Sequence, residues 1–348
     1  MRGSRPRHPY LLITLLAALV LAALTSLCLG ALPIPLANVL GWVGLPGGTP
    51  PAPHEAVALT QLRLPRILLG ILVGAALGMA GAAMQGLVRN PLADPGLIGI
   101  SSGAALAACA VLVFGVSLGL APTTWAAQWL LPVGAFVGAA LATVLALRLA
   151  RAEGYTRMTT LLLAGLAINA VAGAGIGFLA QLADEQALRS ITFWMFGSLG
   201  RSGWHEILMA ALLLGLPLLL LPRQSTALNA LLLGEAEAGH LGINTERLKQ
   251  QVMWLVVLAV GTAVAVAGII GFVGLIVPHI LRIAYGPDHR RLLPASALGG
   301  ALLLVVADTV ARTTFAPSEL PVGILTALLG GPFFLGMLIR FRNRPELA

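Results

Sequence analysis

Apolar runs of about 20 residues recur along the whole chain and constrain its fold more than any other feature. A run of that length crosses the hydrocarbon core of a bilayer as a helix, because backbone groups in lipid must bond within their own segment. Ten runs can be placed, at 10–31, 64–87, 96–116, 127–150, 157–181, 205–222, 251–268, 271–285, 293–313 and 321–340. The chain is 58% hydrophobic and 10% charged, with a mean hydropathy of +0.93. We therefore predict an all-α polytopic membrane protein with about ten transmembrane helices.

The basic residues predict the orientation of these spans. Lysine and arginine number 21 against 13 acidic residues, a formal net charge of +8 (21 − 13). They lie mostly in short loops between spans, so they indicate topology rather than nucleic-acid binding. With the N-terminus in the cytoplasm, sixteen (21 − 5) fall inside and five outside, namely Arg63, Arg66, Arg189, Arg201 and Arg312. Both termini are then cytoplasmic. The seventh and eighth spans are separated only by the glycines around Gly268 and Gly271, but a nine-span count would leave the basic C-terminus outside.

The longest polar interruption is the segment 223–251, which this topology places in the cytoplasm. Ser225 or Thr226 can cap one short helix there, and Gly239 and Gly242 can end it because glycine adopts the left-handed turn without steric cost. Asn244 or Thr245 can then begin the next span. Such a helix can sit in a groove of another protein and transmit its movement, or it can simply join two spans. Periodicity alone leaves both interpretations open.

A second polar segment, 85–105, interrupts the apolar sequence near the third span. Pro91 and Pro95 break a helix there, and the side chains of Asn90 and Asp94 can bond the freed backbone groups. A third segment, 271–296, carries Pro278 inside a span, where it can kink the helix. Polar side chains at membrane depth usually face a bundle interior or a water path.

Six motifs resemble one family in the same order along nearly the whole chain. They are QLRLPR at 61–66, RNPLADPGLIGIS at 89–101, LLLAG at 161–165, GFVGLIVPHILR at 271–282, DHRRLLP at 288–294 and ELPVGILTALLGGPFF at 319–334. They resemble the FecCD family of ABC-importer permeases, which carry iron-siderophores, heme and vitamin B12 into bacteria. The resemblance implies a type II importer fold in which residues 1–348 form a single permease domain in the inner membrane.

The resemblance also implies partners: a second copy in a homodimer, two cytoplasmic ATPase subunits and a periplasmic binding protein. The segment 223–251 would be the coupling loop that docks on the ATPase. The coupling residues implied are Leu233, Gly234, Glu235, Ala238, Leu241 and Gly242. A residue-level check supports a separate ATPase. A Walker A loop needs a lysine to reach the phosphates, and the only lysine, Lys249, follows no glycine-rich loop. ATP and magnesium would therefore be used by the partner, with no cofactor bound by this chain.

The family also assigns roles to residues at both membrane faces. Arg63, Arg66 and Arg312 match arginines that pair with carboxylates of the binding protein, whereas without the family they read as membrane-interface anchors. A cytoplasmic gate maps onto Met158 and Thr159, just before LLLAG. The RNPL motif adds a second constriction at Asn90 and Leu92. The alternative for Met158 is ordinary packing, and for Asn169 we expect a hydrogen bond to a neighbouring helix.

The substrate is the least constrained feature. The segment 178–204 resembles the heme-importing branch, and its aromatic residues Phe193, Trp194 and Phe196 can contact a large planar ligand or anchor the interface. Vitamin B12 and ferric siderophores are the alternatives. An ion-coupled secondary transporter needs buried carboxylates, for which Asp308 is the candidate within the spans. His54, His205 and His279 lack metal-ligand spacing, and no nucleophile or His/Asp/Glu cluster suggests a membrane enzyme.

Overall fold

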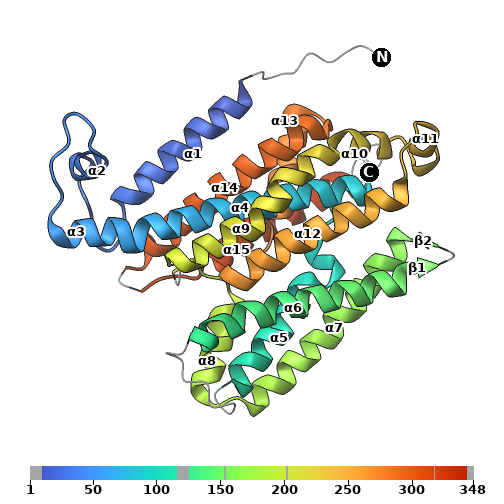
Figure 1. Ribbon diagram of the computed structural model, residues 1–348, viewed down its shortest axis with the longest axis horizontal. Coiled ribbons are helices and arrows are strands. Elements are labelled where there is room, and N and C mark those ends of the chain that lie inside the picture. The colour runs from blue at the N-terminus through green and yellow to red at the C-terminus, as the bar shows by residue number, and fades with distance from the viewer. Residues whose placement is uncertain (1–9, 116–124, 153, 201–202, 317, 343–348) are drawn as a thin grey trace.

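The computed structural model describes residues 10–115, 125–152, 154–200, 203–316 and 318–342. The described chain is almost entirely helical (Figure 1). The α-helices are α1 (Leu11–Cys28), α2 (Leu36–Val43), α3 (Pro53–Val57), α4 (Leu64–Val88), α5 (Ile100–Phe114), α6 (Trp125–Ala150), α7 (Met158–Leu182), α8 (Glu185–Met195), α9 (Trp204–Leu220), α10 (Ser225–Leu231), α11 (Glu235–His240), α12 (Thr245–Ala267), α13 (Val273–Tyr285), α14 (His289–Thr314) and α15 (Val322–Arg342). Three short helical segments are the π-helix η1 (Ala58–Arg63) and the 3₁₀ helices η2 (Pro95–Ile98) and η3 (Leu221–Gln224), and β1 (Arg151–Ala152) pairs with β2 (Tyr155–Thr156) in an antiparallel hairpin.

Ten of these helices correspond to the ten predicted spans. Seven helices of the described chain are long and apolar enough to cross a membrane, and three shorter apolar helices, Ile100–Phe114, Val273–Tyr285 and Val322–Met337, account for the rest. The separation of the seventh and eighth spans is confirmed. Gly268 has φ of +72°, and a Cβ there would lie 2.3 Å from the carbonyl oxygen of Trp194. The backbone therefore requires glycine where α12 ends, and Phe272, in the left-handed region at φ 67°, precedes α13.

The core is organised around α4, which is the most deeply buried of the long apolar helices described. Its small residues allow close backbone contacts. A Cβ on Gly74 would lie 2.4 Å from the carbonyl oxygen of Gly300, and one on Gly78 would lie 2.1 Å from that of Ser296, both in α14. A Cβ on Gly81 would lie 1.9 Å from the carbonyl oxygen of Gly274 in α13. This small-residue packing is the one that membrane helices use in place of a hydrophobic driving force.

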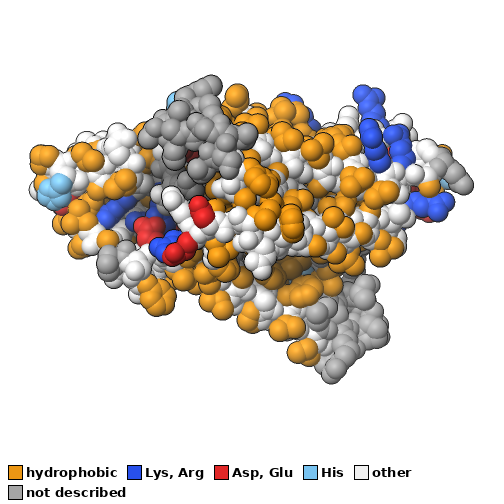
Figure 2. Space-filling model, turned by 90° about the horizontal axis from the view of Figure 1, so that it is seen from below, with side chains coloured by type: hydrophobic (Ala, Val, Ile, Leu, Met, Phe, Trp, Pro, Cys, Tyr) orange, Lys and Arg blue, Asp and Glu red, His pale blue; other side chains and the backbone are white. Residues whose placement is uncertain are grey.

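The elements form two adjoining groups with a common long axis (Figure 1). One group surrounds α4 and contains α1, α9 and α12–α15, and the other contains α5–α8. We call the end that carries α3, η1 and α8 the arginine end, and the end that carries α10, α11 and the hairpin the loop end. Figure 2 shows hydrophobic side chains over the middle of one face and charged side chains gathered toward the two ends. An apolar belt between two polar ends is the surface expected of a membrane-spanning protein.

The segment 223–251 differs from the prediction of one helix. It contains two, α10 and α11, which are separated at Gly234, where φ is +128°. Gly239 lies inside α11 rather than at its end. Ser225 is not a cap, because η3 and α10 continue directly from α9. Gly242, with φ of +82°, follows α11, and Asn244 caps α12 by accepting a hydrogen bond from Arg247 N at 2.9 Å, both as expected.

Candidate functional site

The two segments that carry the predicted gate residues adjoin elements that pack together. Met158 and Thr159 begin α7, and Asn90 and Leu92 precede η2. Between α4 and η2 the side chain of Asn90 accepts a hydrogen bond from Leu92 N at 2.9 Å, and Asp94 accepts one from Gly96 N at 2.7 Å. These are the backbone bonds predicted for the proline-broken segment. A Cβ on Gly165 of α7 would lie 2.1 Å from the carbonyl oxygen of Leu97, so α7 packs directly against η2.

Asn169 strengthens this contact, as expected of a hydrogen bond between helices. Its side chain accepts a hydrogen bond from Ser102 in α5 and donates one to the carbonyl oxygen of Gly96 at 3.4 Å. Of the predicted gate residues, Thr159 and Asn90 are exposed, and Met158 and Leu92 are half-buried. The ends of α4 and α7 that carry these residues both point toward the loop end (Figure 1).

At the loop end, α11 presents an exposed apolar surface. Leu233 and Leu241, which flank the helix, are 62% and 63% exposed, whereas Ala238 on its inner face is fully buried. Gly234 and Gly242 supply the positive φ angles on either side. Six predicted coupling residues are therefore brought together in one projecting turn, with its inner side packed and its leucines uncovered.

A hydrogen-bond network anchors α10 to the turn before α14. Asn229 donates to Asp288 Oδ1 at 2.6 Å and accepts from His289 N at 2.8 Å, while Asp288 caps α14 through Arg290 N at 3.0 Å. Burial tends to raise the pKa of the Asp288 carboxyl, but these hydrogen bonds and the charges of Arg290 and Arg291 outweigh it and lower that pKa below its usual value. The base of the loop is therefore fixed by a charged carboxylate.

At the arginine end, the three predicted docking arginines are buried inside the subunit. Arg66 Nε lies 2.8 Å from Asp308 Oδ2, and Arg66 Nη2 donates to Asp308 Oδ1 at 2.9 Å, a bidentate pair between α4 and α14. Its third nitrogen, Nη1, lies 2.8 Å from Glu319 Oε2, just before α15. Arg63, Arg66 and Arg312 are 6%, 9% and 7% exposed.

The other two arginines of this cluster hold α1 in place. Arg63 donates to the carbonyl oxygens of Leu27 and Leu32, and Arg312 donates to the carbonyl oxygen of Ser26 and, at 2.8 Å, to its hydroxyl. The family resemblance predicts that these guanidinium groups pair with carboxylates of a binding protein. Instead, carboxylates and carbonyls of the same chain occupy them, and Glu319, about half exposed, carries the uncovered charge. Asp308, Glu319 and Ser26 are contact partners of these arginines that spacing along the sequence could not identify.

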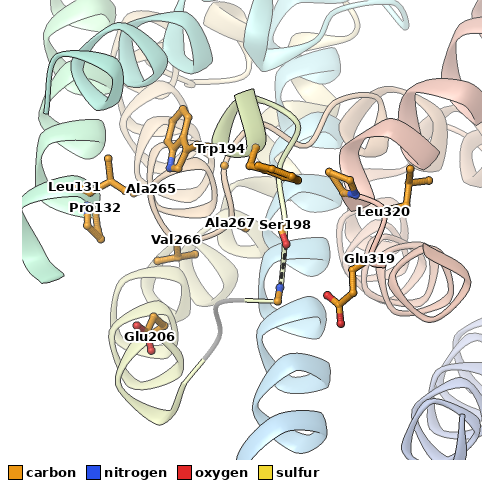
Figure 3. A pocket seen from close by; sticks show the side chains of 14 residues that line it. Leu131, Pro132, Trp194, Ser198, Glu206, Ala265, Val266, Ala267, Glu319 and Leu320 are labelled. Carbon is orange, nitrogen blue, oxygen red and sulfur yellow. Dashed lines mark hydrogen bonds between the residues drawn. The ribbon is translucent and has the colours of Figure 1, made fainter. Parts of the chain in front are cut away.

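A pocket of about 380 Å³ opens beside this cluster (Figure 3). In that view Trp194 lies on one side, and the carboxylates of Glu206 and Glu319 lie on the other. The remaining lining residues are Leu131, Pro132, Phe193, Ser198, Gly200, Ala265, Val266, Ala267, Gly268, Leu320 and Pro321. Trp194 is mostly buried in the core, while Phe193 and Phe196 are exposed. The described residues contain no group of three or more His, Cys, Asp or Glu side chains that could hold a metal ion.

Comparison with known proteins gives consistent matches over most of the chain. The model of the FecCD transport family matches residues 18–340. The hemin transport system permease protein HmuU of Yersinia pestis is 48% identical over 82% of this chain and 84% of its own length. The cobalamin import system permease protein BtuC of Halobacterium salinarum is 41% identical over 89% of this chain and 80% of its own length. The vitamin B12 import system permease protein BtuC of Vibrio cholerae is also 41% identical, over 82% of this chain and 84% of its own.

Solved structures agree on the fold. An inward-facing conformation of a metal-chelate type ABC transporter superimposes with a TM-score of 0.81 at 32% identity, covering 96% of this chain and 99% of that one. PsaBC from Streptococcus pneumoniae, at 17% identity and a TM-score of 0.52, shares the fold alone. The predicted fold, that of type II ABC importer permeases, is confirmed. The chain is thus a multi-span helical membrane protein that belongs to the FecCD transport family.

Proposed function

We propose that this chain is the permease subunit of an ABC importer that moves heme or a similar iron chelate from the periplasm to the cytoplasm. The observation that carries the proposal is the 48% identity to a hemin permease over 82% of the chain. The permease lies in the bacterial inner membrane with both termini in the cytoplasm. Residues 1–9 and 343–348, which hold the basic termini, lie outside the described residues.

The proposed pathway lies between two copies of the chain, along α7. One side of α7 is uncovered, and its exposed positions include Gly173 and Gly177, where an added Cβ would meet nothing within 4 Å. A row of small residues leaves room for a bulky planar ligand in a homodimer. Met158 and Thr159 at the start of α7, with Asn90 and Leu92, form the cytoplasmic gate.

Two ATPase subunits bind the loop end, and ATP and magnesium are used there rather than by this chain. The support is the projecting turn around α11, whose exposed Leu233 and Leu241 each adjoin a glycine with positive φ and supply an apolar contact. Removing such apolar side chains from water favours association with a partner. The periplasmic binding protein docks at the arginine end through Arg63, Arg66 and Arg312, and Arg66 contacts the half-exposed Glu319 beside them.

A vitamin B12 or ferric-siderophore permease is the second candidate, since B12 permeases are among the relatives at 41% identity. An ion-coupled transporter is less well supported, because Asp308 is already paired with Arg66 at 2.8 Å and is not free to bind a coupling ion. The deciding experiment is uptake by proteoliposomes that contain the permease, its ATPase and its binding protein. Labelled hemin should accumulate with ATP and not with a non-hydrolysable analogue, and faster than B12 or a ferric siderophore. Preferential uptake of B12 would favour the second candidate.

A further inference from the structure

Lys249, the only lysine in the chain, lies inside the protein near the start of α12. Its side chain is 4% exposed. An ammonium group is costly to remove from water unless it is paired and hydrogen-bonded. The contacts of Lys249 are therefore expected to matter to the state of the loop end.

Lys249 joins two segments that are remote along the chain. Its Nζ lies 2.6 Å from Oε2 of Glu235, the first residue of α11, and donates to the carbonyl oxygen of Thr156 in β2 at 3.1 Å. The first contact is a charge-assisted hydrogen bond, which is short and about twice as strong as a neutral one. Thus one buried cation holds both α11 and the hairpin.

Thr156 is held by α12 on its other side as well. Its backbone N donates to Glu246 Oε2 at 3.0 Å, and its hydroxyl donates to Glu246 Oε1 at 2.6 Å. All three polar groups of Thr156 are therefore bound by the first turns of α12. Arg157, the next residue, is the N-cap of α7, so one residue separates Thr156 from Met158. A displacement of Thr156 must move the start of α7.

α11 is connected to the rest of the chain by glycines with positive φ at both flanks, Gly234 and Gly242. Glycine restricts the backbone least of all residues. The inner face packs through Ala238, and Glu235 is the side chain that ties α11 to α12 by an ion pair. Movement of α11 therefore either carries Lys249 and Thr156 with it or separates the ion pair and leaves a buried cation without its carboxylate.

We propose that Glu235, Lys249 and Thr156 form a relay that transmits displacement of α11 to the start of α7. This inference rests on the proposed function, in which α11 docks on the ATPase and Met158 and Thr159 form the gate. Lys249 is a positioning residue: it touches neither substrate nor nucleotide, and its role is to couple one end of the relay to the other.

The test compares Lys249→Met and Lys249→Arg in proteoliposomes that hold the complete transporter, with labelled hemin as the probe. Coupling between two sites typically changes an equilibrium by about 5–150-fold, so Lys249→Met should lower hemin uptake per ATP hydrolysed by about tenfold. ATPase co-purification and the hydrolysis rate should stay close to wild type. Lys249→Arg, which keeps the charge and donors, should restore most of the ratio.

A matched pair of variants on α11 separates the relay from general effects of surface charge. Glu235→Ala removes the ion pair, whereas Glu237→Ala removes an exposed carboxylate of the same helix two residues away. Only Glu235→Ala should lower the uptake ratio. As a readout independent of the substrate, a cysteine at position 159 (Thr159→Cys) should change its thiol reactivity with nucleotide state in the wild-type background. That dependence should be lost with Glu235→Ala.

An unchanged uptake ratio in Lys249→Met, or equal losses in Glu235→Ala and Glu237→Ala, would overturn the relay. If Lys249→Met does not accumulate, the α11 pair and the cysteine readout decide the question. The proposed function fails in a different way: the wild-type permease would then neither co-purify with an ATPase nor take up hemin, B12 or a siderophore.

Discussion

Both ends of the molecule bury basic side chains, three arginines at one end and Lys249 at the other, but the numbers of their partners differ. At the arginine end, Arg66 makes a bidentate pair with Asp308 and a further contact with Glu319, while Arg63 and Arg312 bind carbonyls near the end of α1. At the loop end, Lys249 has one carboxylate partner, Glu235, which is 41% exposed. The arginine cluster joins α1, α4, α14 and the approach to α15 redundantly, whereas Lys249 holds α11 by a single ion pair and the hairpin by a single hydrogen bond.

The difference indicates which end is built to stay fixed. Several partners per charge mean that separating any one pair leaves the others in place, whereas separating the pair of Glu235 and Lys249 breaks the ion pair that holds α11. The arginine cluster therefore resists rearrangement. At the loop end, α11 can change its position when one ion pair separates, because it is flanked by glycines and held by that single pair. Helix α4 runs from one end of the molecule to the other (Figure 1). At its start it follows η1, which ends at Arg63, and near its C-terminal end Gln85 accepts a hydrogen bond from Arg282 at 2.8 Å.

Breaking α4 should have the largest effect, because both ends depend on it. A Cβ on Gly78 would lie 2.1 Å from the carbonyl oxygen of Ser296, so Gly78→Leu cannot be accommodated without moving α14. We expect a loss of stability above about 5 kcal/mol and little folded protein in membranes. The control is Gly215→Leu in α9, where a Cβ meets nothing within 4 Å. Detergent-extracted yield and thermal unfolding check this prediction, and equal yields of the two variants would contradict it.

Removing the central carboxylate of the arginine cluster should have the next largest effect. Asp308→Ala leaves Arg66 with Glu319 alone and takes away the nearest carboxylate of Arg312, which lies 3.9 Å from it. Removing one partner of a buried pair costs about 3–5 kcal/mol. Thermal unfolding of the purified permease measures the loss. Arg189→Ala, which removes an exposed pair with Glu185 at 3.2 Å, should change stability little. Similar losses of thermal stability in both variants would mean that the buried pairs of the cluster stabilise the protein no more than an exposed pair does.

The corresponding change at the loop end should cost less. Glu235→Ala removes the carboxylate of Lys249 but leaves the bond to the Thr156 carbonyl oxygen, and Glu235 itself is partly solvated. A hydrogen bond to a charged group contributes about 1.5–3 kcal/mol, so we expect a loss at the lower end of that range. The same unfolding measurement applies. A loss as large as that of Asp308→Ala would remove the distinction between the two ends.

Sequence reasoning succeeded where apolar length and local capping carry the information. The ten spans follow from run length, the break between α12 and α13 from its glycines, and the start of α12 from Asn244. It failed at α10 and α11 because three glycines, at 234, 239 and 242, look alike in sequence. Only the folded chain shows that Gly234 and Gly242 take a positive φ, whereas Gly239 lies within α11. It also failed to anticipate the burial of the three arginines.

That second failure has a physical cause. Arg66 and Asp308 are 242 residues apart, and only the packing of α4 against α14 brings them into contact. An arginine at the end of a span reads as outward-facing until its partner is known. The same holds for Lys249, whose carboxylate lies 14 residues away on a helix the sequence did not delimit. The roles predicted for the gate residues and the docking arginines stay predictions.

The smallest expected effect tests docking at the arginine end. The formal charge of the cluster formed by the three arginines, Asp308 and Glu319 is only +1 (3 − 2). Glu319 is about half exposed, so Glu319→Gln should fold and raise this charge to +2. Exposed charges contribute about 0.2–1 kcal/mol each and act mainly on association rate. If acidic side chains of a binding protein meet this surface, the variant should bind that protein up to a few-fold faster in low salt. The gain should vanish at 1 M salt, where the Debye length is about 3 Å.

Glu237→Gln, which makes the same charge change at the loop end, should leave association unaffected. Surface-bound transporter in nanodiscs, titrated with binding protein at both salt concentrations, gives these rates. Equal rates for Glu319→Gln and wild type in low salt would mean that the arginine cluster serves the fold alone and that the binding protein recognises other residues at this end.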